Sequence, residues 1–264
     1  MILVGRNWML LLLVVLTASF QFAHSEESLS AKLSEQKAIP SSVDEDDEEE
    51  DDEDGTSSAS SASELDASLT AGVEFTSDYI SRGVTLTDHS PAIQAALESF
   101  TPSGIQLGIF ASNARLSTGA DGLELVSNAG YFYRFNSDLK VGLSFSYAAY
   151  FPTENNNWEI PLDIYWKFAQ LRATYIPDYG EEPGRVLHVS LGVKHEVFGV
   201  TLGARAGVSS MPQGSEHSDY IDFRLSLAKL WLGFNWDLSF YCVDHTQFKG
   251  ADDPRLVFAV SKFF

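Results

Sequence analysis

The residues that could do chemistry in this sequence recur at every second position within apolar stretches. Between positions 158 and 168, Glu159, Asp163 and Lys167 alternate with isoleucine, leucine and tryptophan. A period of two puts the charged residues on one face of a β-strand and the apolar residues on the other. Such interleaved acids and bases can form ion pairs or select solutes along a polar passage.

The predicted set that could line such a passage is Glu74, Asp78, Gln94, Glu124, Arg134, Lys140, Glu159, Asp163, Lys167, Arg172, Lys194, Arg205, Asp222, Arg224 and Asp237. The same face would also carry Glu98, Gln106, Asn128, His188, Glu196 and Asn235. A network of ion pairs that fills the interior would explain these residues as well as a selective passage would, and both interpretations stay open.

No pattern singles out a catalytic or metal centre. The sequence has no Gly-x-Ser-x-Gly motif. His89, His217 and His245 each follow an acid in a predicted loop, but their spacing does not match a metal-binding motif. The single cysteine, Cys242, falls on an apolar strand face, where it is a poor nucleophile. We therefore expect no enzyme, no metal and no cofactor.

The elements that position these residues are strands, since no long helical period is visible. Twelve segments are predicted as strands: 69–80, 91–100, 104–113, 122–135, 139–151, 158–168, 170–176, 185–198, 200–209, 219–230, 231–243 and 255–264. Long connections alternate with short ones along the whole series. An up-and-down antiparallel barrel with long outer loops and tight inner turns would produce this alternation.

The apolar face favours a membrane barrel over a soluble one. Lys262 is its one charge in the best-patterned strands, and it lies at a strand end. Most predicted strands have 10 to 13 residues, whereas soluble strands average about 5–6 and tilted membrane strands need about 9–11. Aromatic residues gather near strand ends, as interfacial girdles require. We predict a closed all-β transmembrane barrel, because lipid cannot satisfy the backbone of an open edge.

Two segments precede the predicted barrel. Residues 1–25 combine Arg6, an apolar run and a small-x-small site at Ala23-His24-Ser25, which predicts a secretory signal peptide. Residues 26–64 include eleven consecutive acids from Asp44 to Asp54 and predict a disordered acidic spacer. This run supplies much of the net charge of −20, and no basic patch indicates nucleic-acid binding. The barrel is predicted over residues 65–264.

The first predicted hairpin, F-T-S-D-Y-I-S-R-G-V-T-L-T-D-H-S-P-A-I-Q, resembles the signature of the TorF-like family of outer-membrane porins, the Gcw_chp group. A second segment, G-I-Q-L-G-I-F-A-S-N-A, is similar to the third strand of the same family. The matching positions include Ser77, Asp78, Tyr79, Arg82, Gly83, Thr87, Pro91, Gln94, Ser112 and Asn113. The resemblance implies an exported bacterial outer-membrane barrel that passes small solutes.

These observations lead to three hypotheses for function. The first is a pore for passive diffusion of small polar solutes, and the second is a structural or adhesive barrel with a plugged lumen. The third, a barrel enzyme acting at the rim, has the least support. The expected partners are outer-membrane lipid, small solutes and the barrel-assembly machinery, which would recognise the C-terminal strand ending in Phe264. At Asp78 and Arg82 we favour a loop anchor over a gate.

Overall fold

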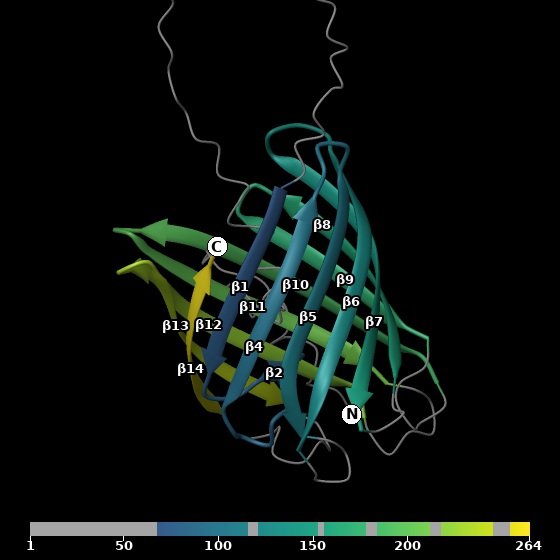
Figure 1. The fold of residues 1–264 in the computed structure, drawn as a ribbon, viewed down its shortest axis with the longest axis vertical. Helices are drawn as coiled ribbons and strands as arrows, with labels where there is room; N and C mark the ends of the chain where they lie inside the picture. The colour runs from purple at the N-terminus through teal and green to yellow at the C-terminus, as the bar shows by residue number, and fades with distance from the viewer. Residues whose placement is uncertain (1–67, 116–120, 153–155, 178–183, 212–217, 245–253) are drawn as a thin grey trace, which may run out of the picture.

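The computed structural model describes residues 68–115, 121–152, 156–177, 184–211, 218–244 and 254–264. In these residues twelve long strands form one closed antiparallel barrel, and two short strands form a separate hairpin (Figure 1). The barrel strands are β1 (Ser68–Thr76), β4 (Ala92–Phe100), β5 (Ile105–Arg115), β6 (Asp121–Arg134), β7 (Leu139–Phe151), β8 (Asn157–Trp166), β9 (Ala169–Ile176), β10 (Val186–Val197), β11 (Val200–Ser210), β12 (Tyr220–Trp231), β13 (Phe234–Asp244) and β14 (Arg255–Phe263).

The barrel closes between its first and last strands. β1 pairs antiparallel with both β4 and β14, so neither end of the strand series is left as an open edge. The seam runs from the pair Gly72–Phe263 to the pair Thr76–Ala259. Ala71 and the terminal Phe264 extend it through two backbone hydrogen bonds of 3.2 and 2.9 Å. Every barrel strand is therefore paired on both sides.

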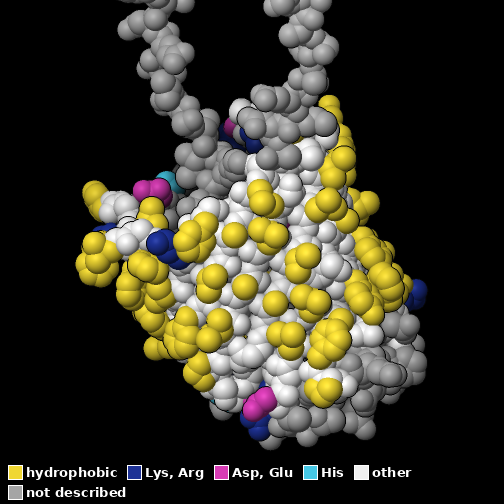
Figure 2. Space-filling model, in the orientation of Figure 1, with side chains coloured by type: hydrophobic (Ala, Val, Ile, Leu, Met, Phe, Trp, Pro, Cys, Tyr) yellow, Lys and Arg dark blue, Asp and Glu magenta, His cyan; other side chains and the backbone are white. Residues whose placement is uncertain are grey.

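The two faces of the wall are chemically distinct. Large apolar side chains such as Leu107, Leu143 and Leu225 are exposed on the outside, at 55, 56 and 50%. Polar and charged side chains at the alternating positions are buried, among them Glu98, Asp163 and Asp222. Figure 2 shows hydrophobic side chains spread over the wall and charged ones toward its edges. This distribution, with apolar side chains outside and polar ones inside, is the reverse of that in a soluble protein and is typical of a barrel surrounded by lipid.

The connections follow the predicted alternation. Five connections have two to four residues each, at residues 101–104, 135–138, 167–168, 198–199 and 232–233. All lie at one end of the barrel, called the turn end below. Phe198, Gly199, Leu232 and Gly233 have positive φ angles, which two-residue hairpin turns require. The longer connections lie at the opposite end, called the loop end.

Several strand limits differ from the prediction. β1 ends at Thr76, so Asp78 and Tyr79 lie beyond the wall. β12 continues to Trp231, and the turn is Leu232–Gly233, because glycine accepts the left-handed conformation there. β8 ends at Trp166, and the following turn holds Lys167, which was predicted on the inward face of the strand.

The predicted signal peptide (1–25) and acidic spacer (26–64) lie outside the described residues. Within the described part of the chain, no helix has the length and apolar character needed to cross a membrane.

A charge on the outer wall should destabilise the barrel according to its depth. Leu225 lies in the middle of β12, so Leu225→Arg should lower the free energy of unfolding in lipid vesicles by about 2–4 kcal/mol. Leu69 is equally outward but lies near the turn end, so Leu69→Arg should cost about 0–1 kcal/mol. Urea titration of the folded, vesicle-inserted protein measures both. Equal costs would contradict the assignment of the outer face to lipid.

Candidate functional site: a hairpin folded into the barrel

The connection between β1 and β4 carries a small hairpin of its own. β2 (Ile80–Ser81) pairs with β3 (Val84–Thr85), and Arg82 and Gly83 form the two-residue turn between them. Their φ angles are +49° and +80°, the sign that a type I′ hairpin turn needs at both positions. A backbone hydrogen bond of 2.7 Å from Leu86 to the carbonyl of Tyr79 extends the pairing.

Asp78 holds the base of this hairpin together. One of its carboxylate oxygens accepts hydrogen bonds from the hydroxyls of Thr85 at 2.6 Å and Thr87 at 2.9 Å. The other oxygen lies 3.4 Å from Nδ1 of His89 and 3.7 Å from Nη1 of Arg255 on β14. Since these contacts join both arms of the connection to the wall, Asp78 is an anchor, as expected from the sequence.

Apolar side chains of the hairpin pack against the inside of the wall. Ile80 belongs to a buried cluster with Tyr241 and Val257, on β13 and β14. Tyr79 packs against Phe110 of β5, with ring centroids 5.9 Å apart. Val84 packs against a second cluster, which is formed by Ile176, Val186, Met211, Tyr220 and Val243. These contacts fix the hairpin inside the loop-end half of the barrel.

The tip of the hairpin crosses the lumen. A Cβ atom at Gly83 would lie 2.5 Å from Cγ2 of Val243 and 2.8 Å from Cβ of Asp222, so the backbone approaches β12 and β13 closely. The preceding residue, Arg82, reaches β8 and donates a 2.5 Å hydrogen bond to Glu159. β8 lies far around the barrel from β12 and β13. The hairpin therefore bridges separate parts of the wall.

Other residues of the quoted motif fasten the two ends of this connection. Ser77 exchanges hydrogen bonds of 2.8 and 3.0 Å with the backbone of Phe258 on β14. The Asn113 side chain accepts from the amide of Ile93 at 2.7 Å and donates to the carbonyl of Pro91 at 3.0 Å. Gln94 and Ser112 pair across β4 and β5, with the Gln94 amide nitrogen 3.4 Å from the Ser112 hydroxyl. These residues of the motif therefore all hold the β1–β4 connection in place.

The wall next to the hairpin tip carries a ladder of arginines and carboxylates. Arg205 and Arg224 lie directly opposite each other on β11 and β12, a position in which like charges repel. Each is compensated on the next strand: Arg205 by Asp222, and Arg224 by Asp237 at 3.0 Å. All four side chains are buried, and Arg224 also stacks 5.2 Å from the ring of Tyr241. Burial on this scale is tolerable only because the charges are paired.

The opposite side of the lumen is held in a similar way. Arg172 binds Asp163 through two nitrogens, at 2.7 and 3.1 Å. The ammonium of Lys140 lies 5.0 Å from the ring of Phe132 and 4.3 Å from that of Tyr165. A Cβ atom at Gly142 would overlap the Phe132 ring, so the glycine leaves room for it.

Carboxylates of β4 and β6 are bound by neutral donors. The hydroxyl of Tyr150 donates to Glu124 at 2.7 Å, and the side-chain amide of Gln106 donates to Glu98. Both carboxylates are buried.

The structure places most of the predicted interior set on the inward face. The buried members are Glu74, Gln94, Glu124, Asp163, Arg205, Asp222, Arg224 and Asp237, and the half-buried members are Lys140, Glu159, Arg172 and Lys194. Asp78 is inside the barrel but belongs to the hairpin connection, not to a wall strand.

Two predicted interior residues lie at the rim of the turn end. Lys167 occupies the turn after β8, exposed and 3.6 Å from Asp138 of the neighbouring turn, so it does not line the interior. The prediction failed because it continued the strand alternation through the turn. Arg134 is the last residue of β6 and is exposed.

The described histidines do not form a catalytic or metal arrangement. His188 Nδ1 lies 2.9 Å from the hydroxyl of Ser209 and 4.0 Å from Asp222, so serine and carboxylate share one ring nitrogen. The other nitrogen lies 3.4 Å from Arg205. A nucleophilic triad needs the two partners on opposite nitrogens. His217 and His245 lie outside the described residues, and the described part holds no cluster of three or more candidate metal ligands.

A family model described as a bacterial protein of unknown function, Gcw_chp, matches residues 58–258. The chain belongs to the Gcw_chp family. The motif-rich β1–β4 connection lies inside the matched range. This confirms the Gcw_chp part of the resemblance read from the sequence, while the TorF-like name stays a prediction. A comparison with curated proteins finds no match.

Solved structures give the fold. The KdgM porin aligns at a TM-score of 0.50 and 16% identity, over 75% of this chain and 99% of its own. An outer membrane channel from Pseudomonas putida F1 gives 0.48 at 14%, over 74% and 95%, and the outer membrane protein OprD from Pseudomonas aeruginosa gives 0.39 at 11%, over 75% and 65%. The likeness to KdgM confirms the predicted fold, a closed antiparallel β-barrel.

A side chain at the hairpin tip should displace the hairpin. Gly83→Ala adds a Cβ where Val243 and Asp222 already lie, and it also strains a positive φ angle. Gly199→Ala strains a similar positive φ angle in open space, so it is a matched control. We expect trypsin to cleave after Arg82 faster in Gly83→Ala than in the wild type or Gly199→Ala. Mass spectrometry of the fragments measures this, and equal rates in both variants would contradict the inserted position.

Proposed function

We propose that this protein is an outer-membrane porin through which small polar solutes diffuse past the β2–β3 hairpin. The observation that carries the proposal is the hairpin itself, held inside a polar barrel with the Arg82–Glu159 ion pair at its tip. A twelve-stranded barrel is narrower than the 16–18-stranded porins that leave an open aqueous channel. A hairpin packed inside such a barrel narrows the lumen at the loop end.

Exposure separates the charges that could meet a solute from those that stabilise the wall. The side chains of Arg82 and Glu159 are 19 and 21% exposed, whereas those of Arg205 and Asp222 are 7 and 1% exposed. A charge pair selects solutes only if they can reach it. We therefore assign charge selection to Arg82 and Glu159, and structural support to the buried ladder.

A barrel with a permanently plugged lumen is a second candidate function. It is favoured by the apolar packing of Val84 and Ile80 against the inner wall, since such contacts resist displacement. In that case the protein would act through its surface, as a structural or adhesive barrel. Both candidates are non-enzymatic, and conductance separates them.

The C-terminal strand supports a proposal about assembly. Phe264 forms the last described backbone pair of the β1–β14 seam. We propose that the barrel-assembly machinery recognises this strand before β1 closes on it.

Removal of the hairpin should widen the pore. Purified protein in planar bilayers should show small single-channel conductance. Replacement of residues 80–85 by two glycines should raise it about twofold or more, because the constriction is lost. Replacement of Pro102 and Ser103, in the turn between β4 and β5, by two glycines is the matched control and should leave it unchanged. No channel events in the folded wild type, with events in the deletion variant, would favour the plugged barrel.

Neutralising Arg82 and neutralising Glu159 should shift ion selectivity in opposite directions. Arg82→Gln leaves Glu159 uncompensated and should raise the ratio of cation to anion permeability, while Glu159→Gln should lower it. Reversal potentials under a potassium chloride gradient measure the ratio. Lys167→Gln, at the turn-end rim, should change it least. Arg82→Gln and Glu159→Gln shifts of the same sign would contradict charge selection by this pair.

A further inference from the structure

The outer wall near the turn end carries a basic and aromatic patch that pore formation does not explain. It consists of Lys229 and Trp231 on β12, Phe234 and Trp236 on β13, Lys262 on β14, and Phe264. We call it the turn-end patch. These residues face the surrounding membrane, because they share their strand faces with exposed residues such as Leu227 and Leu238.

The strand register brings the two lysines to either side of β13. Lys229 lies directly opposite Trp236 across β12 and β13. Asn235 lies opposite Ser261, which places Lys262 beside Phe234 on the outer face. The Lys262 ammonium lies 5.3 Å from the ring centroids of both Phe234 and Phe264. Aromatic rings therefore hold this cation close to the wall.

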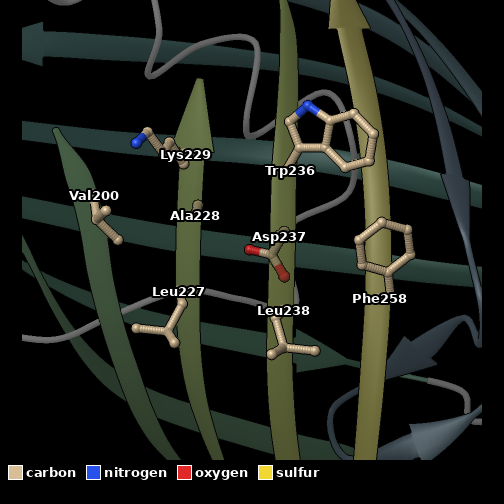
Figure 3. Close-up of a pocket in the computed structure, with 8 residues that line it drawn as sticks. All are labelled: Val200, Leu227, Ala228, Lys229, Trp236, Asp237, Leu238 and Phe258. Atoms are coloured by element: carbon tan, nitrogen blue, oxygen red, sulfur yellow. The ribbon is translucent and has the colours of Figure 1, made fainter. Parts of the chain in front are cut away.

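A shallow apolar depression runs from Lys229 toward the middle of the wall. It is bounded by Lys229 and Trp236 at one end and by Leu227, Leu238 and Phe258 farther from the turns (Figure 3). The Trp236 ring packs 5.9 Å from that of Phe258, and its indole nitrogen donates to the carbonyl of Trp231 at 3.2 Å. The wall of the depression is thus fixed by packing and a hydrogen bond.

The charged side chains of the patch have one sign. Among the described outward-facing side chains of β12, β13 and β14 near the turn end, both charged ones are lysines. Lys167, at the same end but outside the patch, lies 3.6 Å from Asp138. A cation facing a membrane at this depth is compensated most simply by an anionic lipid head group.

We propose that the turn-end patch binds an anionic glycerophospholipid from the leaflet that surrounds the turn end. Lys229 and Lys262 hold the phosphate, and one acyl chain fills the depression over Leu227, Leu238 and Phe258. Tryptophan and phenylalanine stabilise the interfacial level at which the head group lies. Short turns face the periplasm in barrels of this type, so the ligand is a phospholipid of the inner leaflet. The inference rests on the membrane position of the barrel and not on pore formation.

Native mass spectrometry of the full chain folded in detergent tests the inference. Dioleoyl phosphatidylglycerol should bind at lower concentration than dioleoyl phosphatidylcholine, which has the same acyl chains. Each lysine contributes about fivefold to anionic-lipid binding. Lys229→Gln or Lys262→Gln alone should therefore weaken phosphatidylglycerol binding about fivefold, and the double variant about 25-fold. Phosphatidylcholine binding should stay nearly unchanged.

Two control variants distinguish a site from general attraction. Lys167→Gln removes a turn-end cation outside the patch and should bind phosphatidylglycerol like the wild type. The double variant with Lys229→Arg and Lys262→Arg retains the charge and should also bind like the wild type. Equal phosphatidylglycerol binding by the wild type and the double glutamine variant would overturn the proposal. Equal losses in Lys167→Gln and Lys229→Gln would overturn it as well.

Discussion

The hydrogen-bonding demand of a backbone in lipid is the constraint on which the rest of this structure depends. An unpaired amide or carbonyl in hydrocarbon costs several kcal/mol, so the first and last strands have to meet. Here they meet through five register pairs from Gly72 to Thr76, extended by Ala71 and Phe264. Closure then fixes which face of each strand meets lipid and which meets the lumen, because successive side chains point to opposite faces. The apolar exterior and charged interior follow from one register.

The same alternation places charged side chains inside the barrel, where each has to be stabilised. A barrel this narrow leaves little water around them, so each requires a partner. On β11 to β13, Arg205 and Arg224 each bind an acid on the next strand, so the ion pairs run diagonally across the wall. The ladder compensates the repulsion of the directly opposed arginines. The ladder also explains why these residues are too buried to act on solutes, although the sequence groups them with Glu159.

The sequence predicted the wall well and the inserted hairpin poorly, for physical reasons. Period-two alternation is a local property, so twelve strands and their faces could be predicted from neighbouring residues alone. The position of the β2–β3 hairpin depends on contacts between distant segments, such as Ser77 with Phe258 and Arg82 with Glu159. A local signal was present in Arg82-Gly83, flanked by residues that favour strands, and it indicates a turn. Nothing local indicates that the turn folds inward.

The two sides of the hairpin explain how one element could both fill the lumen and leave a passage. Val84 and Ile80 pack against apolar residues on β9 to β14, and the charged pairs of β11 to β13 on this side are buried. The Arg82 side chain at the tip reaches β8, where Glu159 is partly exposed and Tyr150 of the adjacent β7 is half-buried. A solute that loses water at a constriction needs polar groups to replace it. On the proposed porin function, the passage therefore follows the β7–β8 side, while the apolar side holds the hairpin in place.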